Sequence, residues 1–145
     1  MPSATVKVIG VRYVRVSVES GARPGDTTGP SFWPGSVHMP GMYTDWSVGL
    51  DYAVQQGWLE KPPGDQYRLT EAGFARMSVD SDLYAPVNQN GTREQQEDMH
   101  YAIETSGGDR QKGIDEFCEE QRRRRKDIPV NVDAIYDWCK AHALP

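Results

Sequence analysis

Five consecutive cations, Arg122 to Lys126, are the most concentrated group of charged side chains in the sequence. Guanidinium and ammonium groups bind phosphates, so this run could contact nucleic acid or an acidic protein surface. It could instead complement the negative end of a helix and pair with carboxylates one turn earlier. Glu119 precedes Arg123 by four residues and Glu120 precedes Arg124 by four, which is the favourable order. Both interpretations remain open.

Metal-binding and catalytic patterns are weak in this chain. Cys139 and His142 lie three residues apart in an expected helix, and Cys118 and His100 could join them only through folding. Buried free thiols are much commoner than such assembled sites, so we expect no metal site. The nucleophile-elbow, phosphate-loop, dinucleotide-binding and zinc-protease motifs do not occur in the sequence. We therefore expect a non-enzymatic protein without catalytic residues or a cofactor.

The net charge of −5 over 145 residues argues against a generally sticky DNA-binding protein. The acids gather between Met77 and Asp109, where one arginine accompanies seven carboxylates. These carboxylates belong to Asp80, Asp82, Glu94, Glu97, Asp98, Glu104 and Asp109. Such a stretch could meet a basic partner surface, including one that otherwise binds nucleic acid.

Composition also bears on the compartment. No apolar run approaches the roughly 20 residues that a membrane span needs. The N-terminus lacks the basic start and apolar block of a secretion signal. Two cysteines far apart in the sequence fit free thiols in a reducing compartment. These features predict a cytoplasmic protein that makes no membrane contact.

The N-terminal part of the chain predicts a strand followed by a loop. Residues 1–20 are rich in valine, with isoleucine and tyrosine, which favours a strand, and Gly10 suggests a bulge or bend. Residues 21–43 contain many prolines and glycines and predict a loop. Its Phe32 and Trp33 either cover the core or form an aromatic contact surface, and burial is the commoner fate of such side chains.

Residues 44–78 predict a helix, a hairpin and a second helix. Thr44 suits an N-cap, and an apolar stripe follows it until Gly57, which suits a helix C-terminus. The sequence Pro62-Pro63-Gly64-Asp65 predicts a turn between two short strands. Thr70 then suits the cap of the next helix.

Residues 79–145 predict a helical region. Thr92 and Gln95 form a capping-box pattern at the start of a helix that ends at about Glu104. A strongly charged helix follows from Asp109 to about Arg125. The last helix carries an apolar face, which could be core or a dimer seam, formed by Val132, Ile135, Tyr136 and Cys139.

Two short motifs resemble the winged-helix family of DNA-binding domains. They are Gly57-Trp58-Leu59, before the hairpin, and Leu69-Thr70-Glu71-Ala72-Gly73, after it. The resemblance covers Thr44 to Met77 and implies that the preceding helix is the recognition helix and the hairpin is the wing. In that family two helices normally precede the recognition helix, whereas residues 1–43 here predict a strand and a loop.

The resemblance also implies which residues face DNA. On the helix these positions are Ser47, Asp51 and Gln55, and on the wing they are Lys61, Gln66 and Arg68. Glutamine can read adenine, and the wing cations can contact phosphates. A carboxylate at Asp51 repels phosphate, and the helix has no lysine or arginine.

Together these features predict a single compact α+β domain with a winged-helix-like core, an N-terminal strand and C-terminal helices. The favoured function is a small DNA-associated regulator, which could act as a homodimer. Its candidate contacts are Ser47, Gln55, Lys61, Gln66, Arg68, Arg122, Arg123, Arg124, Arg125 and Lys126. The alternative is a protein-binding module, such as an inhibitor or adaptor, that engages a basic partner through Phe32, Trp33, Glu94, Glu97 and Asp98.

Overall fold

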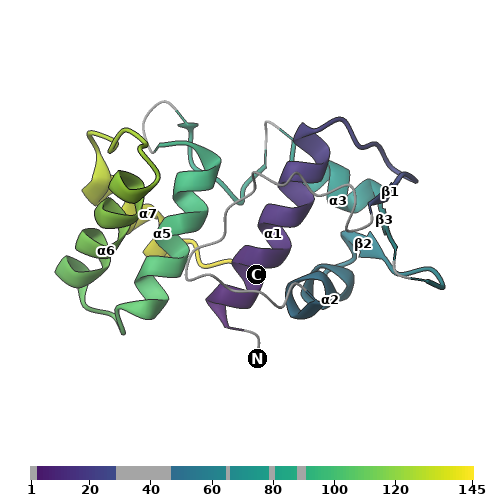
Figure 1. The fold of residues 1–145 in the computed structure, drawn as a ribbon, viewed down its shortest axis with the longest axis horizontal. Helices are drawn as coiled ribbons and strands as arrows, with labels where there is room; N and C mark the ends of the chain where they lie inside the picture. The colour runs from purple at the N-terminus through teal and green to yellow at the C-terminus, as the bar shows by residue number, and fades with distance from the viewer. Residues whose placement is uncertain (1–2, 29–46, 65, 79–80, 88–90) are drawn as a thin grey trace. The chain divides into compact units, whose positions relative to one another are not determined.

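The chain forms two compact units, Met1–Asp82 and Leu83–Pro145. The structure, a computed structural model, describes residues 3–28, 47–64, 66–78, 81–87 and 91–145 (Figure 1). The first unit combines helices with a small sheet, and the second is helical. The predicted α+β class is therefore confirmed. The single compact domain and the boundary at residue 78 that the sequence suggested stay predictions.

In the described part of the first unit, the elements follow one another in the order α1, β1, α2, β2, β3 and α3. The helices described there are α1 (Ala4–Glu19), α2 (Ser47–Gln55) and α3 (Glu71–Arg76). Its strands are β1 (Thr27–Thr28), β2 (Leu59–Glu60) and β3 (Tyr67–Leu69). The described strands form one antiparallel sheet in the order β1-β3-β2. The predicted hairpin is confirmed, and β1 covers the edge of β3 that the hairpin alone would leave unpaired.

The strand predicted over residues 1–20 is wrong, because this segment forms α1. Ser3 caps the helix, and its Oγ accepts a hydrogen bond from the amide of Val6 at 3.2 Å. The valines favour a strand by local propensity, but the burial of α1 outweighs that preference. Val8, Val11 and Val14, which lie at helical spacing, are 1% exposed or less. Apolar residues fill both faces of the expected strand because they surround much of a buried helix.

Two glycines allow α1 and α2 to approach each other closely. A Cβ on Gly10 would lie 2.5 Å from the carbonyl oxygen of Gly49. A Cβ on Gly49 would lie 2.2 Å from Cγ2 of Ile9. Gly10 therefore serves a helix crossing and not the predicted strand bulge. This contact fixes α2 against α1 and directs the opposite side of α2 outward.

The connection between α2 and α3 brings the two winged-helix-like motifs into contact. Gly57 adopts a φ of 80° and ends α2, as predicted. Thr70 accepts a hydrogen bond from the amide of Gly73 at 3.0 Å and donates one to the carbonyl of Gly57 at 2.6 Å. A Cβ on Gly73 would lie 2.2 Å from the carbonyl oxygen of Trp58. The base of the hairpin is thus held by the Thr70 hydroxyl and by the close approach of Gly73 to the Trp58 backbone.

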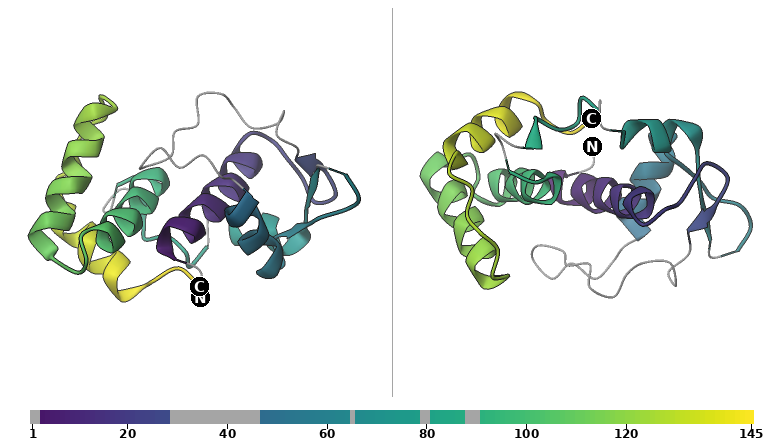
Figure 2. Two further views of the ribbon diagram at one scale, coloured as in Figure 1. Left: turned by 60° about the horizontal axis from the view of Figure 1, so that its bottom comes forward. Right: turned by 90° about the horizontal axis from the view of Figure 1, so that it is seen from above.

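The second unit packs α5 (Arg93–Thr105), α6 (Arg110–Arg123) and α7 (Val132–Ala141) against one another. Figure 2 shows this arrangement from two further directions. The predicted capping box of Thr92 and Gln95 is confirmed. The apolar core consists of Met99, Ala102, Phe117, Ile135, Tyr136 and Cys139. The apolar face of the last helix, which was also considered as a dimer seam, contributes to this core.

Among the described residues, every helix is too short or too polar to span a lipid bilayer.

Replacing Gly49 with alanine tests the helix crossing. In an open helix this change would stabilise the chain by up to about 1 kcal/mol, because alanine favours helix. At this crossing the new methyl group overlaps Ile9, so we expect destabilisation by about 1–3 kcal/mol. The free energy of unfolding, measured by urea denaturation, gives the sign. Asp51→Ala, at an exposed position of α2, is the matched control and should change stability little.

Candidate nucleic-acid interface

The outward side of α2 carries polar groups without a cation. Leu50, Tyr52 and Ala53 are buried, whereas Asp51 and Gln55 are exposed. Ser47 lies at the start of α2, but its side chain is outside the described part of the structure, as is Thr44, the predicted N-cap. The predicted contact Gln55 is therefore accessible. Asp51 shares its side of the helix and would oppose a phosphate.

The hairpin presents the predicted wing residues to solvent. Lys61, Gln66 and Arg68 are all exposed. The Nζ atom of Lys61 lies 5.6 Å from the centroid of the Tyr67 ring, close enough for a cation–π contact. Nη1 of Arg68 lies 3.6 Å from Oε2 of Glu60 on the neighbouring strand. Exposed ion pairs of this kind are weak, so both cations remain able to contact a phosphate.

The cation run at the end of α6 divides into paired and free side chains. Arg124 is 7% exposed in its side chain, and its Nη1 lies 3.0 Å from Oδ2 of Asp98 and 3.1 Å from Oε1 of Glu94. Its Nε donates to Glu120 at 3.0 Å, which confirms the predicted pairing four residues apart. Arg123 pairs with the same Glu120, three residues before it, through Nε and Nη2. Arg124 is thus occupied inside the unit.

Glu120 holds the end of α6 through these two arginines. Partial burial opposes its ionisation, but the hydrogen bonds from Arg123 and the charge of Arg124 outweigh burial and lower the pKa of this carboxyl. Glu120 therefore stays ionised. Two of the five cations in the run serve this internal pairing.

The remaining three cations, Arg122, Arg125 and Lys126, are exposed, and we call them the free cations. Arg125 follows the helix with a φ of 57°, in the left-handed region. Its amide donates to the carbonyl of Arg122 at 3.0 Å, and the amide of Lys126 donates to that of Gln121 at 2.9 Å. These two bonds define a Schellman motif, in which glycine normally occupies the position of Arg125.

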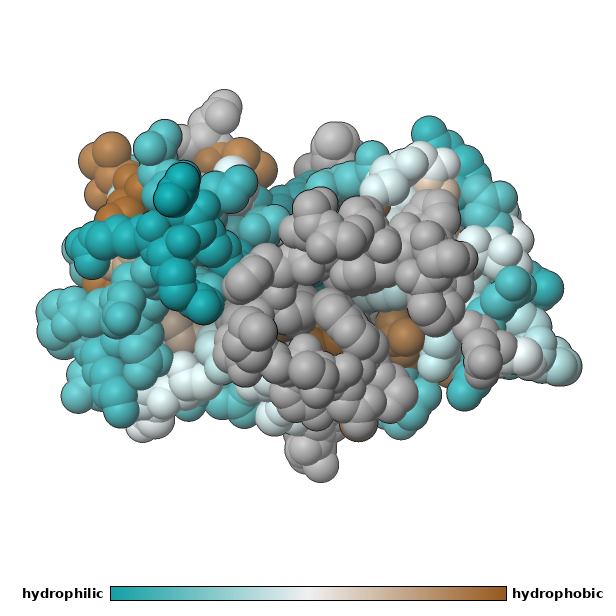
Figure 3. Space-filling view, viewed as in Figure 1, coloured by the Kyte–Doolittle hydropathy of each residue, from teal (hydrophilic) through white to brown (hydrophobic). Residues whose placement is uncertain are grey.

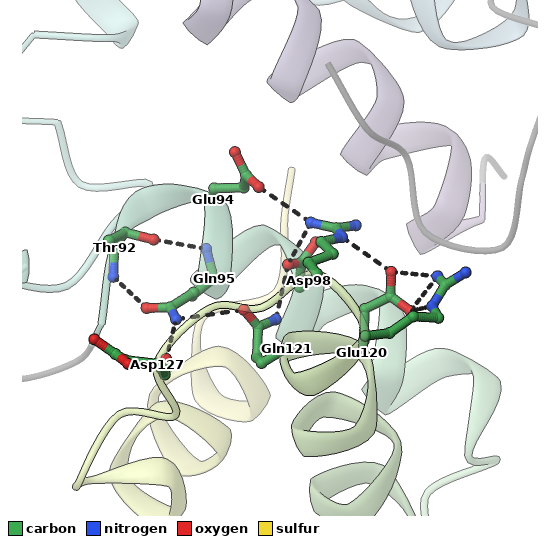
Figure 4. Close-up of polar contacts among 9 residues, drawn as sticks. Thr92, Glu94, Gln95, Asp98, Glu120, Gln121 and Asp127 are labelled. Carbon is green, nitrogen blue, oxygen red and sulfur yellow. Dashed lines mark hydrogen bonds and ion pairs between the residues drawn. The ribbon is translucent and has the colours of Figure 1, made fainter. Parts of the chain in front are cut away.

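A buried chain of amides and carboxylates fixes this end of α6 to α5 (Figure 4). Nε2 of Gln95 donates to the carbonyl oxygen of Asp127 at 2.9 Å and to Oε1 of Gln121 at 3.3 Å. Nε2 of Gln121 donates to Oδ2 of Asp98 at 2.9 Å. Asp98 in turn contacts Arg124, so the chain reaches the middle of the cation run. We call Gln95, Asp98, Gln121 and Arg124 the buried polar chain.

The acidic surface expected on α5 does not form as predicted. Glu97 is 0% exposed and accepts a hydrogen bond from the hydroxyl of Tyr84 at 2.6 Å. Asp98 is 3% exposed and belongs to the buried polar chain. Only Glu94 remains half-exposed, and it pairs with Arg124. Phe32 and Trp33, the other predicted partner contacts, lie outside the described residues.

The thiols and imidazoles of the second unit do not gather into one group of potential metal ligands among the described residues. Burial raises the pKa of the Cys139 thiol to about 12, and Cys118 is half-buried. The His142 ring stacks on Trp138 at a centroid distance of 4.3 Å. His100 is buried, and its Nε2 atom finds no hydrogen-bond partner among the residues that the structure describes. Within the described residues no three such ligands cluster to hold a metal ion.

No model of a known protein family matches the chain, and neither does any curated protein or solved structure. The residues and their geometry therefore carry the functional inference.

Replacing Arg125 with glycine should stabilise the second unit. An L-residue in the left-handed region costs about 1–2 kcal/mol, and glycine removes most of that strain. We expect a gain of up to about 1 kcal/mol, measured as a higher midpoint of urea denaturation. Arg125→Ala removes the same charge but keeps the strain, so its stability should match the parent. Equal stability of the glycine and alanine variants would contradict this account.

His100 should make the chain less stable in mild acid. Burial lowers its pKa from 6.5 to about 4, with a raising contribution from Glu97 and a lowering one from His142. Below about pH 6.5 the unfolded chain therefore takes up a proton that the folded chain refuses. Between about pH 7 and pH 5 this group should remove about 2 kcal/mol of stability.

The difference between the parent and His100→Gln in urea denaturation isolates this contribution, because the other titrating groups are common to both. The loss on acidification should be smaller in the variant. An identical loss in the two proteins would show that His100 titrates normally when folded.

Proposed function

We propose that the chain is a non-enzymatic DNA-binding protein whose first unit acts as a winged-helix-like module, and that it serves as a small regulator. The observation that carries the proposal is the joining of the two resembling motifs at the base of an exposed hairpin. Thr70 bonds to Gly57, and Gly73 lies against Trp58, so α2, the hairpin and α3 form one packed unit.

The architecture around that contact also supports the proposal. A helix at Ala4–Glu19 replaces the strand expected before α2, and a helix in front of the recognition helix agrees better with the family pattern. The pairing of β1 with β3 gives the hairpin a third strand. A two-stranded hairpin alone is marginally stable, so the third strand gives the wing a firmer support.

The exposed residues indicate how such a module would bind. Lys61 and Arg68 supply charge for phosphates, and Gln66 and Gln55 supply amides for bases or backbone. Asp51 on the same side of α2 as Gln55 would repel misplaced phosphates. With so few cations, affinity for generic duplex DNA should be modest, and its dependence on salt should be shallow.

The protein-binding alternative is weaker on this structure, because two of its three acidic contacts, Glu97 and Asp98, are buried and bonded inside the second unit.

Removing the wing cations tests the proposal. The double variant Lys61→Ala and Arg68→Ala should bind a short mixed-sequence duplex more weakly than the parent. The plot of log affinity against log salt should become shallower by about 2, because each lost phosphate contact accounts for about 0.9. Fluorescence anisotropy between about 50 and 200 mM salt measures both quantities.

The matched control is Lys112→Ala with Lys140→Ala, which removes the same charge from exposed positions of the second unit. Its binding should stay close to that of the parent. Absence of DNA binding by the parent at low salt would overturn the proposed function, and equal losses in both double variants would overturn the role of the wing.

A further inference from the structure

We propose that the free cations, Arg122, Arg125 and Lys126, form a second phosphate-binding surface on the second unit, which contacts the backbone of duplex DNA. This inference rests on the proposed function for the identity of the partner. The surface itself is argued from the second unit alone.

The free cations are gathered at one turn of backbone. Arg122 lies in the last turn of α6, and its carbonyl accepts the amide of Arg125 at 3.0 Å. Lys126 follows directly and bonds back to Gln121 at 2.9 Å. In the part of the chain that the structure describes, their three side chains take part in none of the ion pairs found. They therefore keep their charge available for a ligand.

The residues between and beyond the free cations hold them in place. Arg124 is drawn inward by Asp98, Glu94 and Glu120, so its neighbours on each side of the turn point elsewhere. The carbonyl of Asp127, just past Lys126, is held by Gln95 at 2.9 Å. Both fixed points are part-buried contacts with side chains of α5. The backbone that carries the free cations is therefore ordered before binding, and only their side chains lose conformational freedom when a ligand binds.

The strained backbone at Arg125 also supports a binding role for its side chain. Among the described residues it is the one non-glycine residue with positive φ, and it stands where a Schellman motif favours glycine. Its exposed side chain contributes little to the packing of the unit. The Schellman motif requires a left-handed backbone at this position but does not require an arginine. An arginine that adopts this strained backbone is consistent with a side chain used for binding.

The chemistry of the surface suits phosphate. Two of the three free cations are arginines, whose planar fork binds the oxygens of phosphates, as of carboxylates, in pairs. The second unit is predominantly hydrophilic on the face shown in Figure 3. Glu119, exposed one turn before Arg122, limits the number of phosphates that can approach. Val130, 99% exposed in the following loop, is the feature that a lipid surface would use instead.

The test compares Arg122→Ala with Lys126→Ala against the control pair Lys112→Ala with Lys140→Ala, all in the full chain. Affinity for a short mixed-sequence duplex is measured by anisotropy between about 50 and 200 mM salt. The first pair should make the log–log salt dependence shallower by about 2, and the control pair should leave it unchanged. Equal slopes for the two pairs would overturn the inference.

Arg125→Gly separates binding from folding. It should raise the midpoint of urea denaturation and at the same time weaken DNA binding, whereas a merely structural role would leave binding unchanged. Glu119→Gln should strengthen binding, because it removes the nearest exposed carboxylate. Unchanged binding in both variants would count against the surface.

The outcomes for the two proposals are distinct. A parent protein that does not bind DNA at low salt overturns the proposed function and this inference together. If the parent binds DNA and the wing double variant binds more weakly, but the free-cation double variant binds as the parent does, this inference alone is overturned. A third outcome would also overturn this inference. In it, the chain binds phosphatidylserine vesicles, Val130→Ser abolishes that binding, and the free-cation pair leaves DNA binding unchanged. The surface would then be assigned to lipid headgroups.

Discussion

The first turn of α3 lies against the backbone that follows α2, and the presentation of the hairpin depends on this contact. Gly73 has no Cβ to keep it from the carbonyl of Trp58, and the Thr70 hydroxyl reaches back to Gly57. The amide of Thr70 also donates to the carbonyl of Trp58 at 3.1 Å. Because β2 begins and β3 ends at this contact, a residue larger than glycine at position 73 would collide with the backbone at the base of the hairpin.

A different constraint organises the second unit, where a buried arginine decides which charges face solvent. Arg124 forms ion pairs with carboxylates of α5 and α6. Gln95 and Gln121 extend these contacts by hydrogen bonds to the loop that follows α6. Removing one partner of a buried ion pair leaves the others uncompensated, so this arrangement is costly to disturb. The free cations take no part in this arrangement, and their exposed side chains are accessible to a ligand. A run of five similar residues is therefore divided between side chains that pair inside the unit and side chains that are exposed to solvent.

Local signals in the sequence were sufficient for much of the fold. The capping box at Thr92 and Gln95, the glycine that ends α2 and the Thr70 cap each act within a few residues. They were predicted correctly because short-range hydrogen bonds determine them. The hairpin was found for the same reason. The apolar face of α7 was also recognised, since helical periodicity is itself a local pattern.

The errors came from contacts between residues distant in the sequence. A valine-rich segment favours a strand on its own, and only its packing against α2 explains the helix of α1. Glu97 and Asp98 lie in a polar run that resembles an exposed helix face, but Asp98 finds Gln121 across 23 residues. Such pairing leaves no periodic signal in a single sequence. The separation of the cation run into paired and free members was hidden for the same reason.

The proposal that the hairpin and the exposed side of α2 contact DNA can be tested by NMR. The backbone amide signals of the full chain are followed during titration with duplex DNA at low salt. We expect the first signals that move to belong to residues 59–69 and to the exposed positions of α2, with the core of the second unit unaffected. Saturating DNA that leaves the signals of residues 59–69 unshifted would show that the hairpin does not bind it.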